Sequence, residues 1–249
     1  MDIDMSQLRH FSRFARPTLL LLVTGLLLNS SPIALAQYVP PDRGLPGRRE
    51  GGGTRGGCLL NQPSLTALMP KTNFGYTVQA QPTFLWFVPE STATTAEFIL
   101  WSENDSEIYH TTIQLPTEAG IVRVSLPTDG SAPTLETGKD YRWSFAVVCD
   151  PEDRSGDLLT EGWVQRKDLD SQLESQLAQA TPLDRSTLYA QAGVWYEAIS
   201  TLADLRQAQP NNSTVTNRWR TLLNSVELGE FVDQPILELP EATPPETTP

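Results

Sequence analysis

The sequence predicts an α+β protein in which an antiparallel β-sandwich over residues 58–168 precedes a helical region over residues 169–232. Apolar residues alternate with a period of two before Lys167, and the period changes to about 3.6 after it. Turn-forming residues separate the alternating runs at short intervals, which is typical of sandwiches built from short antiparallel strands.

The first 36 residues have the composition of a secretory signal peptide. Three arginines precede an apolar run from Leu19 to Leu28, and Ala34-Leu35-Ala36 supplies a small-residue cleavage pattern. This run is shorter than the roughly 20 residues that span a bilayer, and no later stretch approaches that length. We therefore expect a periplasmic or secreted mature chain without a membrane span.

The net charge argues against two classes of partner. The whole chain carries 18 basic and 30 acidic residues. Loss of residues 1–36 would remove three basic and two acidic residues, leaving a net charge of −13. Nucleic acids and anionic lipids are therefore not expected as partners.

Segments poor in apolar residues flank the predicted domains. Residues 37–57 are rich in Pro, Gly and Arg, which predicts a flexible arm. Its glycine-rich end, Gly51–Gly57, lacks the Lys-Ser/Thr of a phosphate-binding loop, so a linker is favoured. Residues 233–249 are rich in Pro, Thr and Glu, which predicts a disordered, solvated tail.

The clearest predicted strand runs from Tyr141 to Cys149, where alternate residues are apolar and should share the core face. Turn signals such as Asn104-Asp105 and Asp129-Gly130 separate the strands and favour antiparallel pairing. The other predicted strands are Thr83 to Val88, Glu97 to Trp101, Ile108 to Leu115, Ile121 to Leu126 and Leu158 to Gln165.

The segment Leu135–Tyr141, with Gly138 before the core strand, resembles immunoglobulin-like and fibronectin type III domains, where a tyrosine closes a corner of the sandwich. The resemblance implies that the Tyr141 hydroxyl bonds nearby backbone. It implies no activity, because these folds support many functions.

Cys58 and Cys149 are the only two cysteines. An even count in an oxidising compartment favours a disulfide. A metal site or a catalytic thiol would need further Cys or His residues nearby, and His110 is the only histidine after the leader.

A helical hairpin is predicted after Lys167. Thr181-Pro182 supplies an N-cap followed by proline at the first helical position. Residues 188–210 resemble the later part of a tetratricopeptide repeat, with Gly193 at the bend and Ala198 where the helices cross, whereas the earlier part matches poorly. A last helix follows, with Trp219 on its apolar face.

One such repeat cannot bury its own apolar face. The helices therefore dock on the sandwich, which is the favoured alternative, or on a second subunit or another protein. In the second case the candidate partner-binding residues are Trp195, Tyr196 and Trp219.

Taken together, these segments resemble the cyanobacterial secreted family known as domain of unknown function 928. The residues that carry the resemblance are Gly51–Gly56 with Cys58, Pro82–Pro89, Gly138–Phe145, Cys149, Arg154-Ser155 and Leu188–Tyr196. The resemblance implies an extracytoplasmic protein without an established activity.

Motifs for catalysis are absent from the sequence. Gly-x-Ser-x-Gly, His-Glu-x-x-His, Ser-x-x-Lys and Cys-x-x-Cys do not occur. His110 lies in a predicted strand, where a surface position is favoured over a role in a catalytic triad. No catalytic residue, cofactor or cofactor-binding residue is therefore expected.

An acidic turn follows the central strand and could hold calcium. Its carboxylates are Asp150, Glu152, Asp153 and Asp157. Their order differs from an EF-hand loop and Arg154 lies among them, so a solvated turn with a local ion pair is favoured over a metal site.

Three functions follow in order of preference. The first is a non-catalytic extracytoplasmic interaction or scaffold protein with a protein partner. The second is a glycan-binding module of the cell envelope that uses exposed aromatic residues among Trp86, Trp101 and Trp163. The third is a hydrolase with an unconventional site. The oligomeric state and the identity of the partner stay open.

Overall fold

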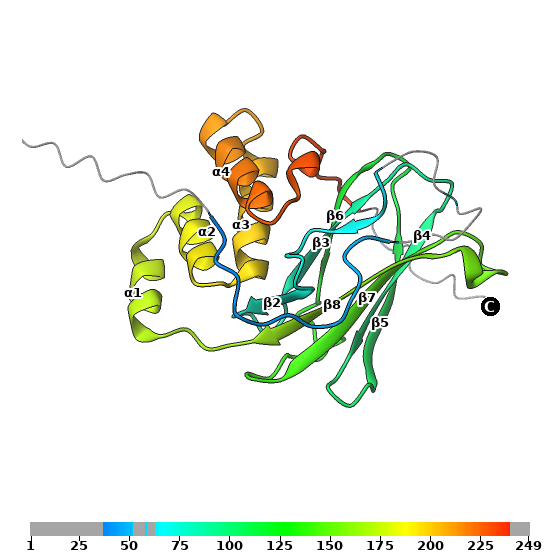
Figure 1. The fold of residues 1–249 in the computed structure, drawn as a ribbon, viewed down its shortest axis with the longest axis horizontal. Coiled ribbons are helices and arrows are strands. Elements are labelled where there is room, and N and C mark those ends of the chain that lie inside the picture. The colour runs from blue at the N-terminus through cyan, green and yellow to red at the C-terminus, as the bar shows by residue number, and fades with distance from the viewer. Residues whose placement is uncertain (1–36, 52–57, 59–62, 240–249) are drawn as a thin grey trace, which may run out of the picture. The chain divides into compact units, whose positions relative to one another are not determined.

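Two β-sheets and four α-helices make up the part of the chain that the computed structural model describes, residues 37–51, 58 and 63–239 (Figure 1). The strands are β1 (Thr66–Ala67), β2 (Phe74–Thr77), β3 (Thr83–Val88), β4 (Thr95–Trp101), β5 (Glu107–Gln114), β6 (Gly120–Ser125), β7 (Asp140–Val148) and β8 (Leu158–Arg166). The helices are α1 (Ser171–Gln179), α2 (Pro182–Gln191), α3 (Trp195–Ala208) and α4 (Ser213–Asn224).

The strands form a five-stranded sheet in the order β2-β8-β7-β4-β5 and a three-stranded sheet in the order β1-β3-β6. Neighbouring strands are antiparallel, as predicted, except that β2 runs parallel to β8. The prediction of a purely antiparallel sandwich is therefore wrong for β2. No tight turn joins β2 to β8, so local turn chemistry could not set the direction in which they pair.

Aromatic side chains from both sheets fill the space between them. Trp86 of β3 stacks on Phe145 of β7, with 4.3 Å between ring centroids, and meets Trp143 edge-on at 5.4 Å. The indole Nε1 of Trp86 donates to the Thr160 hydroxyl at 3.1 Å, so its one polar group is satisfied inside the core. The prediction that alternate residues of β7 face the core is confirmed, because Tyr141, Trp143, Phe145 and Val147 are all buried.

The Tyr141 hydroxyl closes a corner before β7. It accepts a hydrogen bond from the backbone N–H of Glu136 at 3.1 Å. The contact with nearby backbone, implied by the resemblance to immunoglobulin-like domains, is therefore present.

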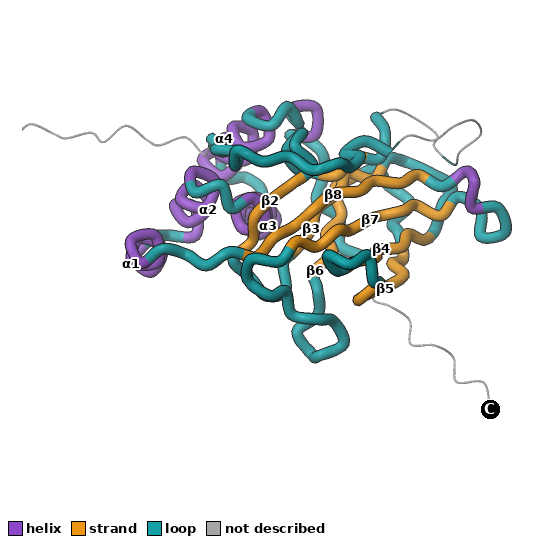
Figure 2. The backbone as a smooth tube through the Cα atoms, turned by 60° about the horizontal axis from the view of Figure 1, so that its bottom comes forward, coloured by secondary structure: helices purple, strands orange, loops and turns teal. Residues whose placement is uncertain are grey.

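The helices gather on one side of the strands (Figure 2), and α3 contacts both β2 and β3. The indole Nε1 of Trp195 donates to the carbonyl of Leu68 at 2.9 Å. The Tyr196 hydroxyl accepts from Trp143 Nε1 at 2.9 Å and donates to the Trp163 carbonyl at 3.1 Å. Docking on the sandwich, the favoured alternative, is therefore what the chain adopts, and one continuous core crosses the predicted domain boundary.

Two glycines make this docking possible. A Cβ atom on Gly75 of β2 would lie 2.9 Å from the ring of Tyr196, so only glycine lets α3 approach this closely. Gly193 lies in the bend between α2 and α3 with φ of +71°, a conformation that favours glycine. None of the helices among the described residues has the length and apolarity needed to cross a membrane.

The segments that flank the sandwich pack more closely than their composition suggests. Tyr38 is buried edge-on against Trp195, with 4.9 Å between ring centroids, and Val39 N–H donates to the Ala190 carbonyl at 3.0 Å. Residues 37–51 therefore differ from the expected flexible arm. Residues 235–237 also pair with β6, although a solvated tail was expected there. Residues 52–57 and 240–249, like the leader at 1–36, lie outside the described part.

A buried carboxyl group lies where α3 meets the five-stranded sheet. Oε1 of Glu197 accepts from the Thr77 hydroxyl and, at 3.3 Å, from the backbone N–H of Gln79. Oε2 has no hydrogen-bond partner among the residues that the structure describes. Burial raises the pKa of Glu197 above its ordinary value, and the hydrogen bond from Thr77 opposes this only in part. The acidic side chain is therefore more easily protonated in the folded chain than in the unfolded chain.

Replacement of Glu197 by glutamine should change how stability depends on pH. The folded state binds this proton more tightly, so the contribution of Glu197 to the free energy of unfolding is fully present below pH 4.5 and falls as pH rises above it. Urea unfolding from pH 4 to pH 8 should show a shallower decline for Glu197→Gln than for the wild type. Glu174→Gln, at an exposed position on α1, should keep the wild-type slope. Identical slopes for Glu197→Gln and the wild type would contradict a raised pKa for Glu197 in the folded chain.

Candidate functional site

The free edge of β5 is the candidate binding site, because other segments of the chain pair with β1 and with part of β6, and α3 packs against β2. At β1, Gly51 N–H donates to the Leu65 carbonyl at 2.7 Å and Ala67 N–H donates to the Arg49 carbonyl at 2.8 Å. Helix α3 packs against β2 through the residues around Gly75.

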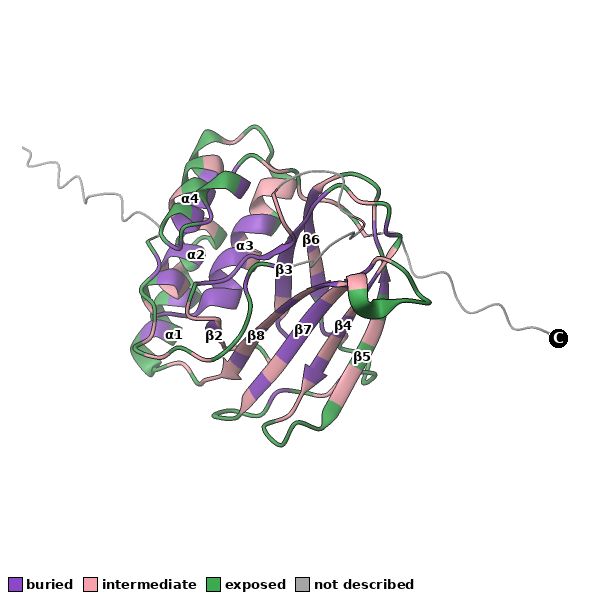
Figure 3. Cartoon of the chain, turned by 45° about the vertical axis from the view of Figure 1, so that its right-hand side comes forward, coloured by how far each residue is buried: buried purple, intermediate pink, exposed green. Residues whose placement is uncertain are grey.

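The C-terminal segment covers part of β6. Ile121 N–H donates to the Pro235 carbonyl at 2.7 Å, and Leu237 N–H donates to the Ile121 carbonyl at 2.8 Å. No described residue pairs with β5 on the side away from β4. In Figure 3, β5 is the outermost strand of its sheet and is coloured mainly as intermediate and exposed.

The pattern of hydrogen bonds between β4 and β5 shows which residues of β5 direct their backbone groups toward this free side. Leu115 N–H donates to the Thr94 carbonyl at 2.8 Å. Because bonded positions repeat every second residue in an antiparallel pair, Thr111 and Ile113 also direct their backbone groups toward β4. The backbone N–H and C=O groups of His110, Thr112 and Gln114 therefore point away from the sheet.

The side chains of β5 do little to block another strand. The strand has eight residues and no proline, whereas exposed edges are commonly protected by shortness, proline or several charges. His110 is exposed, as predicted, and its Nδ1 lies 3.7 Å from Oε1 of Glu107 at the start of the strand. The edge beyond Glu107 therefore remains geometrically open to strand addition.

A second candidate surface lies on the outer face of the five-stranded sheet, defined here as the face that points away from the three-stranded sheet. Trp101, Arg142 and Trp163 are cross-strand neighbours there and are all partly exposed. The guanidinium of Arg142 lies 4.1 Å from the ring centroid of Trp101 and pairs with Asp105 and Glu161, both at 3.2 Å. We call Trp101, Arg142 and Trp163 the outer-face row.

The glycan hypothesis named Trp86 as well, and the structure corrects this part. Trp86 has an exposed fraction of 0% because it packs between the sheets. Trp101 and Trp163, which alternate with buried residues of β4 and β8, keep outward positions. The indole Nε1 of Trp163 donates to the Pro46 carbonyl at 2.7 Å, which fixes the orientation of that ring.

The three candidate partner-binding residues of the helices lie inside the chain. Trp195 and Trp219 have exposed fractions of 0% and Tyr196 of 3%. The polar groups of all three bond within the chain, and Trp219 Nε1 donates to the Val232 carbonyl at 3.1 Å. A direct contact between these side chains and a partner does not fit this placement, because the strands cover Trp195 and Tyr196 of α3 and the neighbouring α3 and residues 229–232 cover Trp219.

The acidic turn after β7 uses its carboxylates locally. Oδ1 of Asp150 accepts from Glu152 N–H at 2.9 Å, and Oδ1 of Asp153 accepts from Ser155 N–H at 3.0 Å. Asp157 forms an ion pair with Arg154 at 2.5 Å, as the favoured interpretation predicts. Within the described ranges, no group of three or more acidic, His or Cys residues could hold a metal ion.

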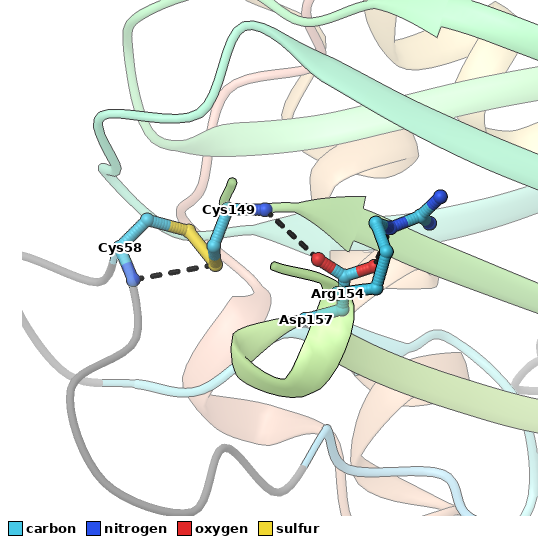
Figure 4. Close-up of a disulfide and its surroundings, with 4 residues drawn as sticks. All are labelled: Cys58, Cys149, Arg154 and Asp157. Atoms are coloured by element: carbon cyan, nitrogen blue, oxygen red, sulfur yellow. Dashed lines mark hydrogen bonds and ion pairs between the residues drawn. A yellow bond between two sulfur atoms is a disulfide. The ribbon is translucent and has the colours of Figure 1, made fainter. Parts of the chain in front are cut away.

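The predicted disulfide between Cys58 and Cys149 is confirmed (Figure 4). It joins the residue that follows β7 to the segment before β1. The backbone N–H of Cys149 donates to Oδ1 of Asp157 at 3.1 Å, and Oδ2 of Asp157 accepts from Arg154 (Figure 4). Arg154 also forms two hydrogen bonds with the carboxylate of Glu97 on β4, which lower the pKa of that carboxyl group. The bridge is therefore held in a network that reaches β4.

Removal of the disulfide should lower stability strongly. The two cysteines lie 91 residues apart, and the loop-entropy model gives a loss of about 4–5 kcal/mol for a loop of this length. The double variant Cys58→Ser/Cys149→Ser should show this loss in the free energy of unfolding measured with denaturant. Reduced wild type should unfold at the same denaturant concentration as the double variant, and a loss below about 1 kcal/mol would contradict a stabilising role.

No curated protein and no solved structure matches the chain. A family model matches residues 50–236, a range that contains all of the strands and helices described above as well as both cysteines. Because this match covers most of the sequence, the chain belongs to the family described as Domain of Unknown Function (DUF928).

Proposed function

We propose that this protein is a non-catalytic interaction protein that binds an extended segment of a partner protein by adding it as a strand to β5. The observation that carries the proposal is the uncovered edge of β5, with the backbone groups of His110, Thr112 and Gln114 directed away from the sheet. Main-chain hydrogen bonds supply the affinity in this mode of recognition.

The side chains of β5 define what the added segment should contain. Ile113 is buried and Thr111 is half-buried on the core side, whereas His110, Thr112 and Gln114 are exposed on the other side. A bound segment would place alternate residues beside each set. We expect apolar or β-branched residues at every second position and polar residues between them. The net negative charge of the chain favours basic residues at the ends of the segment.

We place this interaction outside the cytoplasm, in a cyanobacterial cell envelope or its surroundings. Support comes from the leader-like residues 1–36, from the family resemblance and from the disulfide, because structural disulfides persist mainly in oxidising compartments. The absence of known catalytic motifs from the sequence supports a non-catalytic role. We relate the sandwich to immunoglobulin-like domains on the contact of Tyr141, and the hairpin to tetratricopeptide repeats on Gly193 and Ala198.

A proline on the free side of β5 should abolish strand addition. Thr112→Pro removes an N–H group that has no bond to β4, so the variant should stay folded while losing one outward donor. The probe is the tightest eight-residue peptide selected from a random display library on the wild-type protein. Isothermal calorimetry should show at least tenfold weaker binding to Thr112→Pro than to the wild type.

The matched control is Thr112→Val, which keeps the N–H group and the β-branched shape and should retain wild-type affinity. Circular dichroism melting curves establish that both variants are folded. Equal affinity for Thr112→Pro and the wild type would overturn the proposal, and so would a selection that yields no saturable peptide.

A glycan-binding role is the second candidate, and the outer-face row favours it. Trp101 and Trp163 belong to β4 and β8, which flank β7, so their backbones are two strand spacings or about 10 Å apart. Aromatic rings at such a separation offer an amphipathic platform for sugar rings. This function ranks second because the guanidinium of Arg142 already lies over the Trp101 ring.

Trp101→Ala should abolish binding on a glycan array if the outer-face row is the site, because it removes one of the two partly exposed rings. Ile99→Ala, two residues earlier on the same face of β4, should bind as the wild type does. An array without binding, or a bound glycan that Trp101→Ala still retains, would eliminate the outer-face row.

A further inference from the structure

A polar groove of about 810 Å³ lies between β6, the C-terminal end of α3 and residues 237–239. Its volume is within the range of small-molecule sites. The polar side chains that line it are those of Thr83, Arg123, Ser125, Asp204, Gln207 and Glu238. They come from both sides of the groove and from the C-terminal segment that partly covers β6.

The groove opens where the C-terminal segment stops pairing with β6. The two backbone hydrogen bonds between them both involve Ile121. Leu126 N–H donates to the Pro82 carbonyl, so every second residue of β6 bonds to β3 and the residues between face away from it. Arg123 therefore directs backbone groups toward the groove beyond the last paired residue. No described residue takes up these groups.

Three side chains along the groove are joined by hydrogen bonds through Gln207. Nη2 of Arg123 donates to Oε1 of Gln207 at 2.7 Å, while Nε2 of Gln207 donates to Oε1 of Glu238 at 3.2 Å. Arg123 also forms an ion pair with Asp204. The contacts of Arg123 with Gln207 and Asp204 use two of the five N–H groups of its guanidinium. A connected set of hydrogen bonds and one ion pair therefore runs along the groove.

Two hydroxyl groups complete the lining. Oγ1 of Thr83 and Oγ of Ser125 lie 2.7 Å apart, and either can act as the donor. The groove therefore combines a donor-only guanidinium, two acceptor-only carboxylates, and amide and hydroxyl groups that both donate and accept.

This combination selects among ligand classes. An anionic ligand would meet Asp204 and Glu238, and the one guanidinium is already paired with a carboxylate. A cationic ligand would meet Arg123, and an apolar ligand would leave the polar groups without partners. Ligand hydroxyl groups both donate and accept, so they can bond every kind of group present. We propose that the groove binds a neutral polyhydroxylated ligand, a saccharide or a sugar alcohol.

This site goes beyond the proposed binding of a peptide at β5. The groove lies at the three-stranded sheet, whereas β5 and the outer-face row belong to the five-stranded sheet. Loss of one kind of binding would therefore leave the other unchanged. The variants below also separate the groove from the outer-face row.

Protein-observed NMR titration of the full mature chain tests the proposal. The probes are glucose, galactose, mannose and sorbitol as neutral ligands, with glucuronate and glucosamine as charged counterparts of the same ring. At least one neutral probe should bind saturably, and more tightly than both charged probes. Gln207→Leu should weaken this binding at least tenfold, because it removes the amide that connects Arg123 to Glu238.

Gln179→Leu, an exposed position at the end of α1, is the matched control and should bind as the wild type does. Trp101→Ala should also have no effect. Thr83→Val keeps the shape of its side chain and removes one hydroxyl, so it should weaken binding even if Gln207→Leu proves unstable.

Three results would overturn the proposal. The first is the absence of saturable binding by every neutral probe up to 50 mM, a limit of about 2 kcal/mol of binding free energy. The second is tighter binding of glucuronate or glucosamine than of all neutral probes. The third is binding that Trp101→Ala removes while Gln207→Leu and Thr83→Val retain it, which would move the saccharide to the outer-face row.

Discussion

The seating of α3 on the strands is the contact on which the rest of the structure depends. The Tyr196 hydroxyl connects the indole of Trp143 on β7 with the backbone of β8, and Trp195 bonds the backbone after β1. Each of these polar groups is buried, so a lost partner would leave an unsatisfied group at a cost of about 1–3 kcal/mol. Glycine at position 75 gives the helix room to approach. The strands and helices are therefore one cooperative core and not two separable layers.

This arrangement also determines where the protein can meet other molecules. Four of the six tryptophans, Trp86, Trp143, Trp195 and Trp219, are buried, so they cannot serve as anchors for a partner. Three features remain at the surface: the uncovered β5 edge, the outer-face row around Arg142 and the groove beside Gln207. Each offers a different kind of contact, because an open edge can pair with extended backbone, partly exposed rings can stack on a ligand, and a polar groove can form hydrogen bonds with hydroxyl groups.

Much of the fold was predictable from local signals. The alternation through β7, the change of period after Lys167 and the Thr181-Pro182 helix start each depend on neighbouring residues, and the structure has strands and helices at these places. The pairing of Cys58 with Cys149 followed from an even cysteine count. By contrast, Glu197 gave no signal, because an acidic residue early in a helix is ordinarily exposed and stabilises the helix dipole.

By itself, then, the sequence determined the α+β class, the main strands, the helices and the disulfide, since periodicity and capping act over a few residues. Only the tertiary structure decided which edges are covered, because residues 37–51 and 235–237 have no strand-like pattern and gain their pairing from distant partners. It also decided that Trp86 and Trp195 are interior while Trp101 is not. Burial depends on what packs above a residue, and that neighbour is remote in sequence.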